Sequence, residues 1–181
     1  MALLTQDLSV QSKSSSGGIT YTYILRLIEN SIDEVSNTSN VTIQAILKSS
    51  YSGASFNNYG IGVSCKLNEE QIFSDYKSRS CTSNAEQVYY TWTGDIAHND
   101  DGTLDINVSG EFWIVENSAT YTPKNMSIAS QKISLTTIIR GFIYLKIDGV
   151  RKHCTPFLKV NGTWKKACAY IKANSKWNMA K

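Results

Sequence analysis

Apolar and polar side chains alternate through much of the first 140 residues, and this pattern limits most strongly the folds open to the chain. Apolar residues recur at every second position in 19–27, 41–47, 61–67 and 104–108. A period of two residues puts successive side chains on opposite faces of a β-sheet, whereas an amphipathic helix needs a period of about 3.6. No segment keeps the helical period, so the sequence predicts strands, with at most one helical turn at 68–71.

Clusters of turn-forming residues separate the predicted strands. They are rich in Ser, Asn, Asp and Gly and lie at 14–18, 36–40, 57–60 and 98–102. Seven or eight short strands divided in this way are typical of a β-sandwich. We therefore predict an all-β fold in which residues 1–140 form an antiparallel β-sandwich, of the immunoglobulin-like or jelly-roll-like kind.

The balance of charge changes sharply at Arg140–Gly141. Residues 1–140 carry 9 Lys and Arg against 14 Asp and Glu, a net charge of −5. Residues 141–181 carry 9 Lys and Arg against the single acid Asp148, a net charge of +8. Because such a shift marks a change in physical character, we predict a second, basic module over residues 141–181.

The basic module contains a 13-residue pattern three times, beginning at Tyr144, Phe157 and Tyr170. Each copy runs aromatic, aliphatic, Lys, small aliphatic, Asn or Asp, and then Gly or Ser. Asp-Gly and Asn-Gly favour the type I′ turn, in which both central residues have positive φ. Each copy is therefore predicted to be a β-hairpin. Since a lone hairpin is only marginally stable in water, we expect the three to pack together or onto another surface, as a six-strand meander or a small sheet completed by other chains.

Three segments of the first part resemble a family of siphophage minor structural proteins. They are Gly-Ile-Thr-Tyr at 18–21, the His-Asn-Asp-Asp-Gly-Thr turn at 98–103, and the closing segment at 128–140. The family closes its domain on Leu-Thr-Thr-Ile-Pro-Arg, where this chain has Ile139 in place of Pro. The hairpin pattern, with Val-Asn-Gly-Thr-Trp-Lys in its middle copy, is similar to repeats at the ends of tail and fibre proteins from phages of Gram-positive hosts. The resemblance implies a β-sandwich virion protein, usually associated with the tail, and carries no catalytic residues.

Side chains suited to catalysis or metal binding are sparse. His98 and His153 are the two histidines, each in or beside a predicted turn. The sequence has no serine-nucleophile motif, no phosphate-binding loop and no zinc-ligand spacing. The oxygen-bearing residues of 99–105 only loosely follow a calcium-binding loop, so we interpret them as a plain turn. We predict no enzyme, no cofactor and no metal site.

Other large or reactive side chains are assigned to the core. Trp92 and Trp113 lie in predicted strands of the sandwich, where we expect both to be buried. Cys65 alternates in step with Ile61 and Val63, as a core cysteine does. We expect the four cysteines to be reduced thiols, because no secretory signal precedes them.

The candidate interaction surface consists of side chains that recur in the repeats. Lys146, Lys159 and Lys172 occupy one repeat position and should form one basic stripe, and Trp164 and Trp177 occupy another. The stripe fits an acidic protein surface or a cell-envelope polymer better than a single-stranded nucleic acid, or it keeps the hairpin edges soluble. The two tryptophans fit the core of the module, which we favour, or platforms for sugar rings.

These patterns predict a non-enzymatic, tail-associated phage virion protein. We expect it to act in particle assembly and host-surface attachment, as a homo-oligomer and with other virion proteins. The alternative is a carbohydrate-binding module that recognises a bacterial cell-wall polymer. No apolar run approaches the roughly 18 residues of a membrane span, and the N-terminus lacks the features of a signal peptide. We therefore expect no membrane partner, synthesis in the host bacterial cytoplasm and a final place in the virion.

Overall fold

The structure is a computed structural model. It describes residues 2–14, 16–34, 36–53, 55–99, 101–115, 121–138, 143–147, 149–154, 156–167, 170–173 and 176–179. All regular elements among these residues are β-strands, so the predicted all-β fold is confirmed. No helix in this part of the chain is long and apolar enough to cross a membrane.

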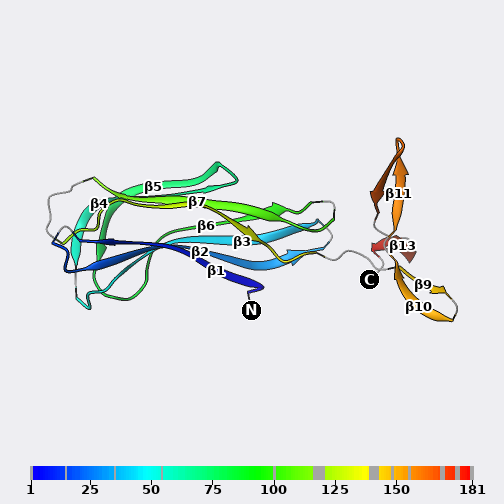
Figure 1. The fold of residues 1–181 in the computed structure, drawn as a ribbon, viewed down its shortest axis with the longest axis horizontal. Helices are drawn as coiled ribbons and strands as arrows, with labels where there is room; N and C mark the ends of the chain where they lie inside the picture. The colour runs from blue at the N-terminus through cyan, green and yellow to red at the C-terminus, as the bar shows by residue number, and fades with distance from the viewer. Residues whose placement is uncertain are drawn as a thin grey trace.

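Eight long strands form two four-stranded antiparallel sheets that face each other (Figure 1). One sheet has the order β1-β2-β3-β6 and the other β5-β4-β7-β8, which together make the predicted sandwich. The bounds are β1 Leu4–Lys13, β2 Thr20–Asp33, β3 Thr38–Ser49, β4 Phe56–Leu67, β5 Glu70–Cys81, β6 Gln87–Ala97, β7 Asp105–Ile114 and β8 Met126–Ser134.

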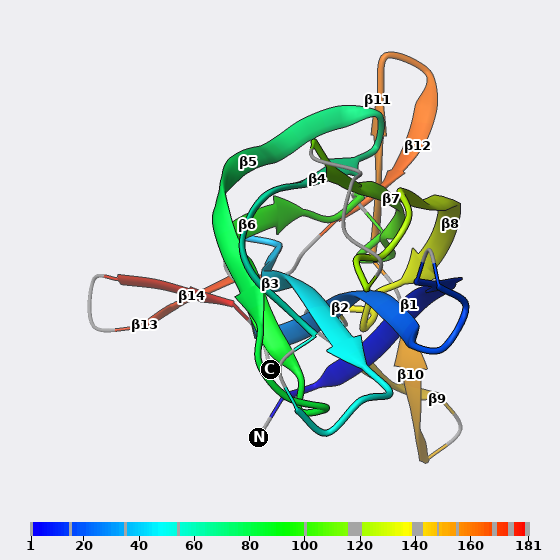
Figure 2. The same ribbon diagram turned by 90° about the vertical axis from the view of Figure 1, so that its left-hand side faces the viewer.

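The core lies between the two sheets, which Figure 2 shows almost end-on. Tyr23, Leu25 and Ile43 enter it from one sheet, and Val63 and Phe112 enter it from the other; all five are at most 1% exposed. All but Phe112 stand at the alternating apolar positions that the sequence pattern marked. Burial of these side chains is the main favourable free-energy contribution that holds the sheets together.

The register of the second sheet brings aromatic residues beside glycine on its outer face. In β4, Gly62 pairs with Tyr76 of β5 on one side and with Trp113 of β7 on the other. Val63, the next residue along β4, pairs with Phe112 and points into the core. Since side chains alternate along a strand, Trp113 must lie on the opposite, outward face.

Three hairpins follow the sandwich. Their bounds are β9 Ile143–Ile147, β10 Val150–Cys154, β11 Phe157–Val160, β12 Thr163–Lys166, β13 Tyr170–Ala173 and β14 Lys176–Met179. In the middle hairpin Asn161 has φ 50° and Gly162 has φ 81°, so both central turn residues are left-handed, as predicted for Asn-Gly. The predicted domain boundary at 140/141 falls within 139–142, outside the described residues.

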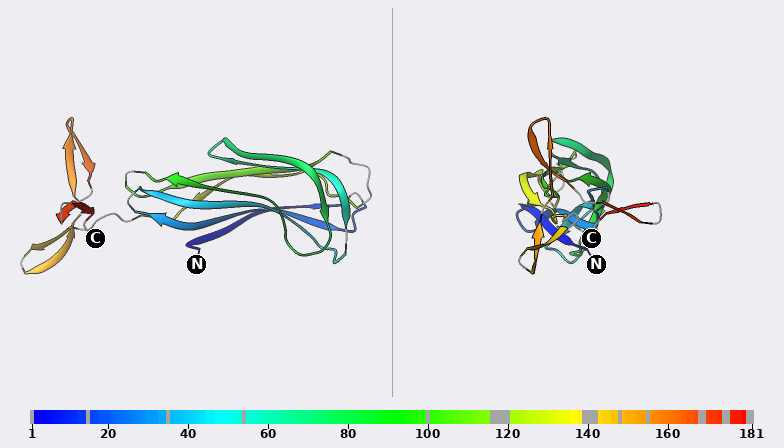
Figure 3. Two further views of the ribbon diagram at one scale, coloured as in Figure 1. Left: turned by 180° about the vertical axis from the view of Figure 1, so that it is seen from behind. Right: turned by 90° about the vertical axis from the view of Figure 1, so that its right-hand side faces the viewer.

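The described hairpins do not form one sheet among themselves, so that part of the expectation is wrong for the single chain. Each hairpin is a separate two-stranded sheet, and its strands pair only with each other. Figure 3 shows the hairpins pointing in different directions. Each hairpin therefore keeps its own open edges.

Candidate functional surfaces

The middle hairpin carries two of the predicted interaction residues. Lys159 of β11 pairs directly with Trp164 of β12. The ammonium of Lys159 lies 5.8 Å from the centre of the Trp164 ring, which is cation–π geometry. The two-residue turn fixes this pairing, because Val160 and Thr163 flank Asn161-Gly162. The repeated Lys and Trp are thus partners on one face of the hairpin.

The expectation that Trp164 belongs to a small core is wrong for this chain. Trp164 is 65% exposed, and Phe157, Leu158 and Val160 are 56%, 60% and 42% exposed. A two-stranded sheet standing alone has no second layer to cover either face. Large apolar side chains left open on a hairpin are typical of a surface that binds another molecule.

The equivalent residues of the other hairpins lie at matching backbone positions. Lys146 of β9 pairs with Arg151, and Lys172 of β13 pairs with Trp177 of β14. Every repeat therefore sets its Lys opposite its Trp or Arg. The side chains of Lys146, Lys172 and Trp177 lie outside the described ones, so the single basic stripe stays a prediction.

A buried polar cluster closes one end of the sandwich core. Glu29 of β2 and Ser39 of β3 continue the inward-facing positions of their strands, and both are 0% exposed. The Ser39 hydroxyl donates to Glu29 Oε1 at 2.6 Å. Thr136 donates to Glu29 Oε2 twice, from its hydroxyl at 2.6 Å and its backbone N–H at 3.1 Å. Three donors thus satisfy a carboxylate that would otherwise be very costly to bury.

His98 completes the cluster through both of its ring nitrogens. Its Nδ1 lies 2.9 Å from the carbonyl of Gly102, which can only accept, so Nδ1 carries a proton. Its Nε2 lies 2.7 Å from the Ser39 hydroxyl, which has one proton and also bonds Glu29. The Ser39 hydroxyl therefore lies between the Glu29 carboxyl group and the His98 ring, within hydrogen-bond distance of both.

This cluster does not have the arrangement of a serine nucleophile. In a catalytic triad the carboxylate orients the histidine, and the serine is open to substrate. Here the carboxylate bonds the serine itself, and Ser39 is fully buried. The hydrogen bonds of the cluster close the end of the core around a buried carboxyl group.

The same cluster joins the turn at 98–103 to the segment that leaves the sandwich. The Gly102 carbonyl accepts from His98 and from the backbone N–H of Ile138 at 2.8 Å. Gly102 has φ 80°, and a methyl group on it would lie 1.9 Å from the Ile138 carbonyl oxygen. Only glycine tolerates both the positive φ and the close approach of the Ile138 carbonyl oxygen. The turn and residues 135–138 are thus closely bonded, and the chain leaves the sandwich from a fixed point.

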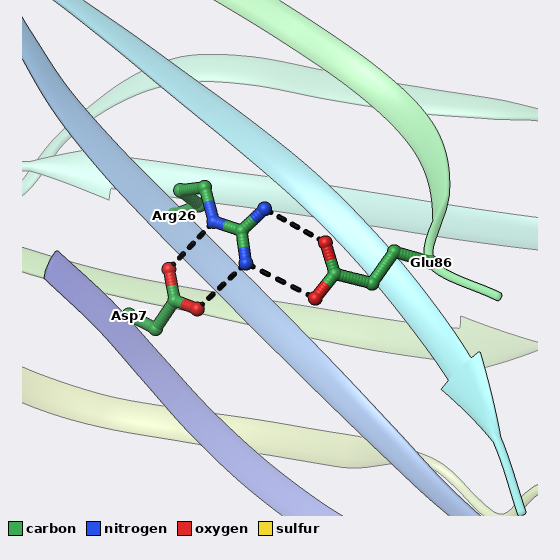
Figure 4. Close-up of polar contacts among 3 residues, drawn as sticks. All are labelled: Asp7, Arg26 and Glu86. Carbon is green, nitrogen blue, oxygen red and sulfur yellow. Dashed lines mark hydrogen bonds and ion pairs between the residues drawn. The ribbon is translucent and has the colours of Figure 1, made fainter. Parts of the chain in front are cut away.

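Arg26 of β2 is held between two carboxylates on the outer face of the first sheet (Figure 4). Asp7 of β1 accepts from Nε and Nη2 at 2.8 Å each, and Glu86 accepts from Nη1 at 2.7 Å and Nη2 at 3.1 Å. Hydrogen bonds from Arg26 lower the pKa of both carboxyl groups and raise the pKa of Arg26. Through these four hydrogen bonds Arg26 joins β1 and the segment before β6 to β2.

Trp113 is the large side chain that the sequence interpretation misplaced. Trp92 packs against the core, as expected. Trp113 is half-buried, but on the outer face. A methyl group on Gly62 would lie 1.9 Å from Cε2, 2.1 Å from Cζ2 and 2.5 Å from Cδ2 of Trp113. Because Cε2 and Cδ2 join the two rings, the flat face of the indole rests on Gly62. In the sequence, Trp113 alternates with the apolar residues Phe112 and Ile114, and this alternation indicates that Trp113 lies on the outer face of the sheet.

Two adjoining hollows lie beside Trp113 along β7 and β8. One, of about 240 Å³, is lined by Trp113, Asn125, Glu111 and Ser127 among others. The second, of about 190 Å³, shares Glu111 and Ser127 and reaches Ser64, Lys66 and Gln71. The outer face of this sheet thus combines one flat aromatic ring with a group of polar side chains.

Metal binding finds no support in the part of the chain that the structure describes. No group of three or more His, Cys, Asp or Glu residues there could hold an ion. Cys65 and Cys81 are free, buried thiols. Burial raises the pKa of Cys65 to about 12.

Comparison with known protein families gives a match over most of the chain. The model of a family described as a siphovirus protein of unknown function (DUF859) matches residues 15–148. No curated protein and no solved structure matches the chain significantly. The matched range contains both the turn at 98–103 and the segment at 135–138 that the Glu29 cluster joins.

Proposed function

The chain belongs to this family of siphovirus proteins, and from that premise we propose that it is a non-enzymatic structural component of the phage virion, associated with the tail. The sandwich acts as a stable body, and the three hairpins act as its docking elements. In this proposal the hairpins bind other copies of the chain and neighbouring virion proteins.

The exposed apolar surface of the middle hairpin is the observation that carries the proposal. Phe157, Leu158, Val160 and Trp164 are all more than two-fifths exposed on a two-stranded sheet that is too small to be stable alone. Burial against another chain would stabilise the hairpin by about 25 cal/mol for each Å² of apolar surface removed from water. The open strand edges offer the same partner backbone hydrogen bonds by strand addition.

Gly162→Val tests this docking role. Valine is strongly disfavoured at the φ of 81° that Gly162 adopts, because its branched side chain collides with the backbone there. We expect the middle hairpin to lose its register, oligomers to dissociate in light scattering, and incorporation into particles to fail. The sandwich should keep its melting temperature. Thr163→Val, which leaves the turn unchanged, is the matched control, and a Gly162→Val chain that assembles like the wild type would contradict the proposal.

Host attachment through a cell-wall polymer is the second candidate function. It is supported by the exposed Trp164 ring with Lys159 beside it. Replacing Lys146, Lys159 and Lys172 together by Gln separates the two functions. Loss of assembly, with the wild type equally sensitive to salt, supports electrostatic docking on virion proteins. Normal assembly with lost binding to host cells favours attachment.

A further inference from the structure

We propose that the outer face of the β5-β4-β7-β8 sheet is a binding site for a neutral sugar, with Trp113 as the platform on which one pyranose ring stacks. The site lies on the sandwich, apart from the hairpins. A test of this site is therefore independent of the assembly role proposed above.

The platform is built by the pairing of Trp113 with Gly62. Glycine leaves no side chain under the indole, so one flat face of the ring rests on the backbone of β4. The other flat face is directed away from the sheet. The axial C–H bonds of a pyranose carry partial positive charge, which the negative face of an aromatic ring attracts. A rigid, flat-lying indole offers that contact at little cost in side-chain entropy.

A second aromatic residue lies on the other side of the same glycine row. Tyr76 of β5 is 53% exposed. A methyl group on Gly60 would lie 2.1 Å from the Tyr76 hydroxyl, so this side chain also leans across β4. The middle of the face is therefore low, with small residues between two aromatic side chains.

Polar side chains beside Trp113 supply the groups that sugar hydroxyls need. Glu111 and Ser127 line both hollows, and Lys66 and Gln71 line the one farther from the indole. Among the residues that the structure describes, none forms a hydrogen bond or ion pair with these four side chains. They offer acceptors and donors that a ring of hydroxyl groups could use together.

Charge and size narrow the class of ligand. Lys66 and Glu111 are the charged residues lining the two hollows, so the lining has no net charge. A neutral ligand fits this balance better than a phosphate-rich polymer, which would favour the basic hairpins. Each hollow is smaller than the roughly 300–1,000 Å³ of a drug-sized pocket, so each suits a single sugar ring.

Binding of the full chain to an array of neutral pyranose oligosaccharides tests the site, followed by calorimetric titration of the best-bound sugar. We expect at least one sugar to bind and Trp113→Ala to weaken its binding by up to about tenfold, since an aromatic ring contact is worth about 0.5–1.5 kcal/mol. Gly62→Ala should weaken binding to a similar extent. Its methyl group displaces the indole, while every polar group and the tryptophan itself remain.

Two matched variants show whether the loss of binding is specific to this face. Gly94→Ala puts a methyl group 2.4 Å from Trp92 on the other sheet, so it repeats the same collision away from the site. Trp164→Ala removes the exposed indole of the middle hairpin. Both should bind the sugar like the wild type, and melting temperatures show which variants are folded. The proposal is overturned if no neutral sugar binds, if folded Trp113→Ala and Gly62→Ala proteins bind normally, or if Trp164→Ala is the variant that loses binding.

Discussion

Replacing Glu29 tests whether the polar cluster at the end of the core is needed for stability. Glu29→Leu removes the acceptor of three hydrogen bonds, one from Ser39 and two from Thr136. Ser39 can still donate to His98 Nε2, so the two donors of Thr136 are the ones left without a partner. An unsatisfied buried donor costs about 1–3 kcal/mol, and Thr136 is partly open to water. We therefore expect Glu29→Leu to lower the free energy of unfolding by about 2–4 kcal/mol.

Glu29→Gln is the informative companion, because an amide can satisfy the whole cluster. Its carbonyl oxygen can accept both bonds from Thr136, and its amide can donate to Ser39. Ser39 then donates to Nε2 of His98, whose Nδ1 still bonds Gly102. Only the extra strength of hydrogen bonds to a charged carboxylate is lost. We therefore expect Glu29→Gln to lower the free energy of unfolding by about 1–2 kcal/mol, roughly half the effect of Glu29→Leu.

Urea unfolding followed by tryptophan fluorescence measures both differences. The midpoints should shift while the dependence on denaturant stays constant, as expected when stability alone changes. Glu111→Gln, an exposed substitution in the same sandwich, should change stability by less than about 0.5 kcal/mol. A Leu variant as stable as the wild type, or a Gln variant as unstable as Leu, would refute the assigned hydrogen bonds.

Two further predictions follow from ionisable groups. Hydrogen bonds from Arg26 lower the pKa of Asp7 and of Glu86. The stability that these two carboxylates contribute is therefore fully present above the ordinary carboxyl pKa of about 4, and it is lost as pH falls through their lowered pKa values. Arg26→Gln should therefore be less stable than the wild type near neutral pH, by about 1 kcal/mol or less for these exposed pairs. Acid titration of unfolding should show the difference shrinking as pH falls, and a difference that grows in acid would refute this assignment. Burial raises the pKa of Cys65 to about 12 and also raises the pKa of Cys81. In a Cys154→Ser, Cys168→Ser variant, we therefore expect neither remaining thiol to react with a thiol reagent at about pH 8 until urea unfolds the protein. Rapid labelling of the folded variant would contradict this prediction.

The strands and hairpins could be predicted because their signals are local. Alternation in 19–27 and 41–47 depends on neighbouring residues only, and the Asn161-Gly162 turn sets its own geometry. The same two-residue turn also determines that Lys159 faces Trp164, a pairing already contained in the repeat pattern. Trp113 is the exception: its alternation with Phe112 indicated the outer face, but the general preference of tryptophan for burial led us to assign it to the core, which was wrong.

The polar cluster could not be predicted in the same way. The inward positions of β2 and β3 lead to Glu29 and Ser39, so the sequence does place two polar side chains at the end of the core. Their partners His98 and Thr136 are brought there by the pairing of strands far apart in the chain. The absence of a common hairpin sheet also depends on the path between hairpins, which the repeat itself does not specify.

Three hairpins of one design, each in its own two-stranded sheet, would make this module trivalent if they bind neighbouring surfaces as proposed. Once one hairpin has bound a neighbouring surface, the short connections hold the other two near it at a high effective concentration. Avidity then multiplies three weak contacts into a strong attachment, provided that the partner presents its sites at a matching spacing. A trivalent end of this kind releases readily from single sites and holds only where sites are repeated, so it would distinguish an ordered array of subunits from the same subunits free in solution.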